Sequence, residues 1–412
     1  MNKPRQSSTT SSAPPRALRD REFRVLWLAY LLSLLGDWLA RLALALLVFQ
    51  RTGSAALTAT ATAASFLPDL LGVGLAGLAD RFPRRRVMIV CDLLRAVVVA
   101  MMVLPGVPVA ALIALMYLVG LAATPFTAAR AALTRDIFAD DTGGYGQAQA
   151  VSTITFEVAQ VAGFAVGGVL AALLGARGAL AVDAVTFLAS AGLVAFGVNA
   201  RPAPGGGQGG WWRDLAAGTR LVLGKPAARL PASLGWLTLF YIAPIGLAIP
   251  YARSQHAGGT AAGFLLAADP AGAALGGFVI SRVRSDRRQR PLMMALAVAC
   301  GLPLLACALQ PPITVVWFLL AASGCCASYF IPARTLFALA IPKANLGQAV
   351  GLVQAGLSVA QGVGVLAAGV AADYLSPLAT IAVSGAFGSL VAVLLAASHH
   401  RYVVGAPQSA IP

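Results

Sequence analysis

Charged residues are scarce in this sequence. Only 11% of its 412 residues are Asp, Glu, Lys or Arg, whereas 58% are hydrophobic, and the mean hydropathy is +0.79. Soluble domains carry roughly 25% charged residues, because water must solvate their surface. The composition therefore excludes an ordinary soluble protein and indicates that lipid surrounds most of the chain.

The residue patterns of metal centres, enzymes and ATP-driven pumps are also missing. The chain has three histidines, in a predicted outer loop and in the tail, and five cysteines that include no C-x-x-C pair. Catalytic Ser/His/Asp and H-E-x-x-H patterns do not occur, and the sequence contains no phosphate-binding loop. We therefore expect a non-enzymatic protein with no metal and no bound cofactor.

Long hydrophobic runs dominate the chain. A helix needs about 20 apolar residues to cross a bilayer, whereas strands of a membrane barrel give weaker segments of about ten alternating residues. The continuous runs therefore predict an all-α membrane protein with twelve transmembrane helices. Their ranges are 24–49, 56–79, 87–105, 108–129, 147–173, 178–199, 231–252, 260–281, 291–308, 312–336, 347–371 and 377–397.

The net charge of +15 is unevenly distributed. If both termini lie in the cytoplasm, 25 of the 30 Lys and Arg residues fall in the tails and inner loops. This is the positive-inside bias that orients membrane proteins. It argues against nucleic acid as a partner, because the basic residues follow the predicted topology.

Polar interruptions divide the chain into five parts. The longest interruption is rich in Gly and Pro and contains Trp211 and Trp212; it forms either a short helix in the membrane interface or a plain cytosolic linker. The predicted parts are a disordered cytosolic tail (1–22), a six-helix bundle (23–200), the linker (201–229), a second six-helix bundle (230–398) and a cytosolic tail (399–412).

The two bundles carry a sequence repeat. Gln160-x-x-Gly163-x-x-x-x-Gly168 recurs as Gln361-x-x-Gly364-x-x-x-x-Gly369, and Ala129-Arg130 recurs as Ala333-Arg334 at a similar offset. Repeated halves related by an axis along the membrane normal are one way in which transporters are built. We therefore expect two pseudo-symmetric bundles.

The loop after the second predicted span combines acidic and basic residues. It reads Gly77-Leu-Ala-Asp80-Arg81-Phe-Pro-Arg84-Arg85-Arg86. This segment resembles the signature G-x-x-x-D-R-x-G-R-R of the major facilitator superfamily, with Ala76 and Pro83 at the glycine positions. In that family the loop latches the inner gate. The resemblance implies a gating role for Asp80, Arg81, Arg84, Arg85, Arg86, Asp92 and Arg95; arginines that only orient the loop would leave the two acids unexplained.

Further segments restrict the resemblance to one branch of the superfamily. Phe23-Arg24-x-Leu-Trp27, Gly36-Asp37 and Phe126-x-x-x-Arg130 look like the branch that contains macrolide-efflux proteins and the enterobactin exporter, which are twelve-span drug:proton antiporters. Gly163-Phe-Ala-Val-Gly167-Gly168 is similar to the antiporter signature G-P-x-x-G-G, with Phe164 in place of proline. Close helix packing of small residues is the alternative interpretation of these glycines, and of Gly364 and Gly369.

Ionisable residues inside predicted spans are candidates for the transport site. A charge at the bilayer centre costs at least about 2.5–3.5 kcal/mol. Asp37 has Arg41 one helical turn away, so the two form either a functional or a permanent structural pair. Glu157 has no basic residue within four positions and is our candidate for the proton site; Asp69 and Asp269 come next. Asp183 is expected to be structural.

The resemblance completes the functional expectation. Trp236, Phe240 and Tyr241 fall on spans that line the cavity in this family. We expect a monomeric exporter of an amphiphilic small molecule in the bacterial cytoplasmic membrane, driven by the proton gradient. Two alternatives remain: uptake or facilitated diffusion through the same fold, including movement of a lysolipid, and a non-transporting receptor or scaffold.

Overall fold

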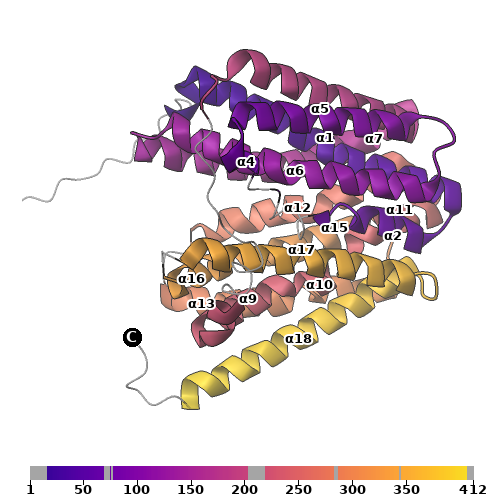
Figure 1. Cartoon of the computed structure of the whole chain (residues 1–412). Helices are drawn as coiled ribbons and strands as arrows, with labels where there is room; N and C mark the ends of the chain where they lie inside the picture. The colour runs from indigo at the N-terminus through magenta and orange to yellow at the C-terminus, as the bar shows by residue number, and fades with distance from the viewer. Residues whose placement is uncertain are drawn as a thin grey trace, which may run out of the picture.

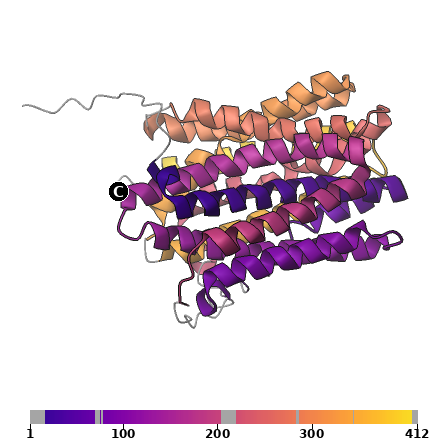
Figure 2. The same cartoon turned by 90° about the horizontal axis from the view of Figure 1, so that it is seen from above.

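The computed structural model describes residues 16–68, 75, 78–202, 219–282, 286–342 and 345–405. Every regular element in these ranges is a helix, and most helices run roughly side by side in both views (Figures 1 and 2). Nine helical segments of the described chain are long and apolar enough to cross a membrane. The predicted all-α membrane fold is confirmed.

The described part of the first half contains one short 3-10 helix and six α-helical elements. Its longest element was predicted as two spans, and it contains a break at Gly175, where φ is 74° and ψ is 167°. This left-handed backbone favours glycine because a Cβ would be strained there. The elements are η1 (Arg16–Arg19), α1 (Arg21–Thr52), α2 (Ala55–Ala63), α4 (Leu78–Arg81), α5 (Arg84–Val103), α6 (Val109–Ile137) and α7 (Thr142–Gly197).

The second half consists of shorter and more broken helices. Several of them contain proline, which cannot donate a backbone hydrogen bond and so interrupts a helix. The elements are α9 (Pro226–Trp236), α10 (Thr238–Tyr241), α11 (Ala243–Ser254), α12 (Gly259–Ile280), α13 (Asp286–Ala299), α14 (Leu302–Leu305), η2 (Ala306–Leu309), α15 (Ile313–Ala327), α16 (Phe330–Ala340), α17 (Leu346–Ala371) and α18 (Pro377–Gly405).

The number of spans stays a prediction. Residues 69–74 and 76–77 of the predicted second span lie outside the described ranges, and α7 counts as one segment although it holds two helices. The predicted boundaries of the tails and linker are likewise untested, because residues 1–15, 203–218 and 406–412 lie outside the described residues.

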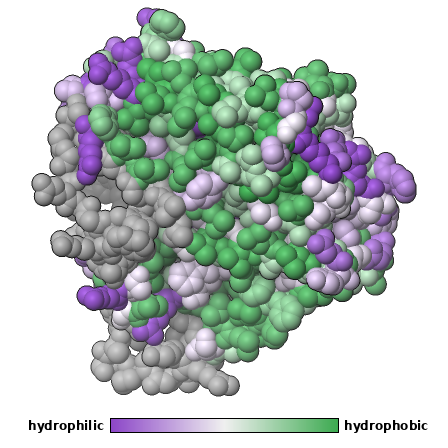
Figure 3. All heavy atoms as spheres, turned by 45° about the vertical axis from the view of Figure 1, so that its right-hand side comes forward, coloured by the Kyte–Doolittle hydropathy of each residue, from purple (hydrophilic) through white to green (hydrophobic). Residues whose placement is uncertain are grey.

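The outer surface is apolar around the middle of the molecule. Large hydrophobic side chains such as Leu173, Phe196 and Leu339 are 74%, 95% and 78% exposed. Figure 3 shows hydrophobic residues over most of the visible face, with hydrophilic residues toward two sides. Such an extended apolar surface is rare on soluble monomers and fits contact with lipid.

Charged groups join the helix ends of the first half at one end of the molecule. Glu22, at the start of α1, accepts hydrogen bonds from Arg201 at 2.5 Å and from the backbone nitrogen of Asn199 at 2.9 Å. Arg84, at the start of α5, forms an ion pair with Asp136, at the end of α6. We call this the basic end, because the loops predicted to be rich in Lys and Arg lie there.

The two halves pack together toward the opposite end. There α2 lies against α11 and α17, and α7 lies against α12. One core cluster combines Ala59, Ala63 and Phe66 of the first half with Ile242 and Val365 of the second. Within the described ranges, the core clusters closer to the basic end each belong to a single half. The molecule is therefore closed at the opposite end and open at the basic end.

Glycines of the sequence repeat lie at these helix contacts. A Cβ on Gly163 or Gly364 would overlap a helix of the same half, α1 or α10, and Gly167 also lies against α1. A Cβ on Gly168 or Gly369 would instead overlap α12 or α2 of the other half. Equivalent glycines thus make equivalent contacts in the two halves, as the predicted pseudo-symmetry requires.

We expect Gly168→Leu to open the contact between α7 and α12. A Cβ at this position would lie 2.8 Å from the Gly259 carbonyl oxygen and 2.9 Å from the Gly263 Cα. Overpacking costs about 1–3 kcal/mol, so the state that is closed at the opposite end should lose population by about tenfold. The reporter is Ala59→Cys, at a position that is fully buried between the halves.

A membrane-impermeant thiol reagent should label that cysteine faster in the Gly168→Leu protein. Gly192→Leu is the matched control, because no atom lies within 4 Å of the position of its Cβ. Equal labelling rates in the two variants would show that the Gly168 contact does not hold the halves together.

Candidate transport site

Arg95 lies at the centre of a buried ionic cluster in the first half. Its Nη2 atom is 2.5 Å from both carboxylate oxygens of Asp37 on α1. Its Nη1 atom donates to Asp92 at 3.2 Å and to Ser33 at 2.8 Å. The side chains of Arg95 and Asp92 are 1% and 0% exposed, whereas Asp37 is 18% exposed. The structure thus places Arg95 and Asp92 inside the bundle, on the helix that follows the predicted gating loop.

Asp183 of α7 completes this cluster. Its side chain is fully buried, accepts a hydrogen bond from Thr186 at 3.2 Å and lies where a Cβ on Gly36 would be. Its charge interacts with those of Asp37, Asp92 and Arg95. The close approach of α1 at Gly36 therefore brings a residue that sequence reasoning had set aside into contact with the predicted site.

Arg41 was predicted as the cation beside Asp37. In the structure Arg95 forms the ion pair with Asp37, and the guanidinium of Arg41 lies over the rings of Trp38 and Phe66, 4.4 Å and 5.2 Å from their centroids. Cation–π contacts of this kind stabilise an arginine that is partly removed from water. The partner that Arg95 provides for Asp37 comes from another helix, so neighbours along α1 did not reveal it.

Glu157 of α7 faces charges of the second half. Its carboxylate is attracted by Arg334 of α16, and Asp269 of α12 experiences the charge of Glu157. Glu157 therefore interacts electrostatically with one arginine and one acid of the second half. Arg334 was missed as a site residue, because the predicted tenth span ended close to it and it was counted with the inner loop.

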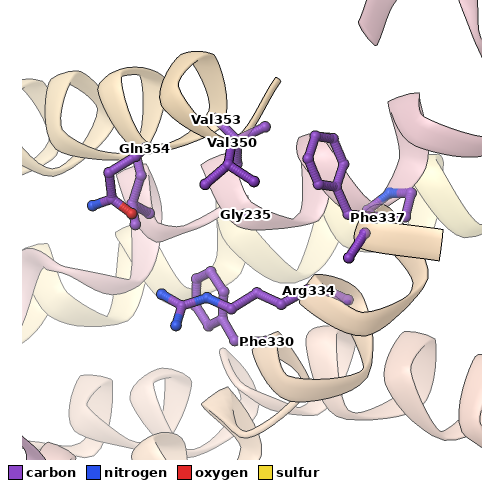
Figure 4. A pocket seen from close by; sticks show the side chains of 11 residues that line it. Gly235, Phe330, Arg334, Phe337, Val350, Val353 and Gln354 are labelled. Carbon is purple, nitrogen blue, oxygen red and sulfur yellow. The ribbon is translucent and has the colours of Figure 1, made fainter. Parts of the chain in front are cut away.

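A cavity of about 280 Å³ lies beside Arg334, between α9, α16 and α17. Figure 4 shows the Arg334 side chain extending across the space next to Phe330, with Gln354 reaching in from α17. Phe337, Val350 and Val353 supply much of the remaining wall. The site thus offers an apolar surface with one cation and one amide, which suits a molecule with both apolar and polar parts.

The predicted aromatic residues lie mainly in helix packing. The Tyr241 hydroxyl donates to the Ala297 carbonyl at 2.7 Å. Trp236 lies where a Cβ on Gly356 would be, and Phe240 packs on a core cluster of the second half. None of these three side chains is among the residues that line the cavity in the described part of the chain.

The arginines of the predicted gating loop bind groups of the first half. Arg84 pairs with Asp136, and Arg85 donates to the Ala195 carbonyl in the last turn of α7, where a cation favours the helix dipole. Arg81 and Arg86 are exposed. Asp69 and the side chain of Asp80 lie outside what the structure describes, so the latch role of Asp80 stays a prediction.

Arg130 is the repeat partner of Arg334 and is also embedded in a helix. Its guanidinium lies 3.8 Å from the centroid of the Tyr30 ring and donates to Ser152 at 3.2 Å. The sequence had placed Arg130 in an inner loop, but α6 continues to Ile137. The repeat Ala-Arg was the available signal that both arginines occupy equivalent helical positions.

Known proteins share the fold and part of the sequence. The profile of the transmembrane secretion effector family matches residues 9–409. The multidrug efflux pump Tap of Mycobacterium tuberculosis is 28% identical over 332 residues, which cover 72% of this chain and 74% of Tap.

Two solved transporters are similar in structure. The nucleoside transporter NupG has a TM-score of 0.74 at 12% identity, over 92% of this chain and 98% of that one. A bacterial homolog of the human lysosomal transporter Spinster, in an inward-facing and occupied conformation, has a TM-score of 0.70 at 15% identity, over 93% and 95%. At these identities the likeness concerns the fold alone.

Proposed function

The chain belongs to the transmembrane secretion effector family, and from this membership we propose that it exports an amphiphilic small molecule of the drug, antibiotic or siderophore class by proton antiport. The observation that carries the proposal is the cavity at Arg334, whose walls are mostly apolar. The similarity to the efflux pump Tap supports export rather than uptake.

The basic end faces the cytoplasm in this proposal. The distribution of Lys and Arg favours that orientation, with both termini inside and the protein monomeric in the bacterial cytoplasmic membrane. The helices of the two halves are packed together at the other end, so this state admits substrate from the cytoplasm. Rocking of the two halves against each other would then expose the substrate on the outer side.

Glu157 is the proposed coupling residue. It is attracted to Arg334, a residue of the cavity wall, so its ionised form favours approach of the two halves. Uptake of a proton by Glu157 removes that attraction. Proton binding and movement of the halves are then linked through one carboxylate, which is the requirement for coupling an ion gradient to transport.

Drug susceptibility and flux together test the proposed function. Cells that make the protein should tolerate some amphiphilic toxic compounds better than cells without it. For such a compound, vesicles that contain the protein should accumulate it when a proton gradient is imposed and release it when a protonophore collapses the gradient. Accumulation that is indifferent to the gradient would reject proton antiport, and unchanged susceptibility across a broad panel would reject drug export.

A further inference from the structure

The ionic cluster of the first half contains more acid than base. Asp37, Asp92 and Asp183 surround a single arginine, Arg95. Arg130, another cation embedded in a helix of the described first half, lies over Tyr30. If all three carboxyl groups were ionised, negative charge would exceed the positive charge of Arg95 in this mostly buried cluster.

Two carboxylate oxygens in the cluster also lack partners. Within the described residues, the Oδ2 atoms of Asp92 and Asp183 are buried and accept no hydrogen bond. Arg95 is within ion-pair distance of Asp37 and Asp92, whereas no ion pair to Asp183 occurs in that part of the chain. An ionised carboxylate in such a place costs several kcal/mol, and a buried group usually becomes neutral instead. Asp183 is therefore the carboxyl group with the strongest reason to bind a proton.

We propose that Asp183 binds an exchangeable proton, and that Arg95 couples this proton to the charge at Asp37. Asp37 is the member of the cluster that is partly exposed, so a cation or a second proton that reaches its exposed side can neutralise it. Asp37 then no longer holds Arg95 by its charge. Arg95 can pair with Asp183 instead, and the charge of Arg95 already acts on Asp183. Asp183 then gives up its proton, which leaves the cluster on the side where Asp37 is exposed, and takes over the pairing with Arg95.

Charge balance favours this exchange. Before it, the charged groups are Asp37, Asp92 and Arg95, and Asp183 is neutral. After it, the charged groups are Asp92, Asp183 and Arg95, and Asp37 is neutralised. The net charge of the cluster is the same in both states, so the exchange adds no charge to a region of low dielectric constant. A positive charge that enters at Asp37 thus expels a proton from Asp183. This deepens the proposed antiport, but it concerns a proton site separate from Glu157.

Infrared spectroscopy of the purified, full-length protein tests the proposal without any substrate. A protonated carboxyl group has a carbonyl stretch apart from the carboxylate bands, and the stretch shifts in D2O. Near neutral pH, we expect one such band to be present in the wild type and absent in Asp183→Asn. Asp37→Asn should lose the same band although Asp183 is intact, because Arg95 then pairs with Asp183. Glu157→Gln should keep it.

Each result either supports or overturns the proposal. A band that persists in Asp183→Asn places the proton elsewhere, and a band of full intensity in Asp37→Asn shows that Arg95 does not couple the two acids. If Asp183→Asn does not fold, Thr186→Val takes its place: the loss of the hydroxyl that donates to Asp183 should shift the band without removing it, and an unshifted band refutes the assignment. If Glu157 proves not to couple proton movement to export, the band assigned to Asp183 is still expected, so the two proposals can fail independently.

Discussion

Glu157→Gln should abolish export against a concentration gradient and leave exchange of substrate intact. Glutamine keeps the size and polarity of the side chain but cannot take up a proton, so the proton gradient no longer drives the halves in one direction. The substrate ratio across the membrane should fall to its value without a gradient. The measurement compares gradient-driven accumulation with exchange of labelled for unlabelled substrate in the same vesicles.

A control variant distinguishes loss of proton coupling in Glu157→Gln from loss of the folded structure. Arg334, to which Glu157 is attracted, is itself exposed, so loss of the carboxylate leaves no buried unpaired cation and the variant should fold. Asp373→Asn, an exposed acid beyond α17, is the control that should transport normally. If Glu157→Gln still accumulates substrate with the usual pH dependence, the coupling proton lies elsewhere, and Asp269→Asn is the next variant to measure.

Arg95→Gln should cause the largest loss of stability among the arginine variants. Removal of the cation takes the ion-pair partner from the fully buried Asp92 and from the partly exposed Asp37, and breaking a buried ion pair costs about 3–5 kcal/mol. The exposed Arg86 provides the matched control, because surface substitutions usually change stability by no more than about 0.5 kcal/mol. Thermal unfolding in detergent should show a much lower midpoint for Arg95→Gln than for Arg86→Gln.

A second substitution distinguishes charge from shape at this site. In the double variant Asp37→Asn, Arg95→Gln, one of the uncompensated acids is gone, so the midpoint should recover part of the loss, as groups in one network are not additive. Arg95→Lys keeps the charge but cannot form the same fork of hydrogen bonds, and its midpoint should lie between the other two. Equal midpoints for Arg95→Gln and Arg86→Gln would mean that the ion pairs of Arg95 contribute nothing to stability.

The membrane fold could be predicted from the sequence because it depends on runs of residues. Continuous apolar segments identify spans whatever their neighbours are, and Gly168 and Gly369 kept their spacing because both halves need the same close contact. The site could not be predicted in the same way. Arg95 reaches Asp37 from a different helix, and Gly36 admits Asp183 from a third, so no spacing along one helix reveals the cluster. Tyr241 illustrates the same limit: the sequence indicated the span that contains it, but not that its hydroxyl points to the Ala297 carbonyl.

The broken helices of the second half have a mechanical consequence. In the first half, α1 and α5 are continuous, and the ionic cluster ties them to α7. In the second half, the helical stretch from α9 to α11 is interrupted near Leu237 and Ile242, and the stretch from α15 to α16 near Ser328. Such joints lack part of the regular backbone hydrogen bonding and bend at lower cost than an intact helix. We therefore expect the second half to bend at these joints when substrates of different size bind, whereas the ionic cluster holds α1, α5 and α7 together.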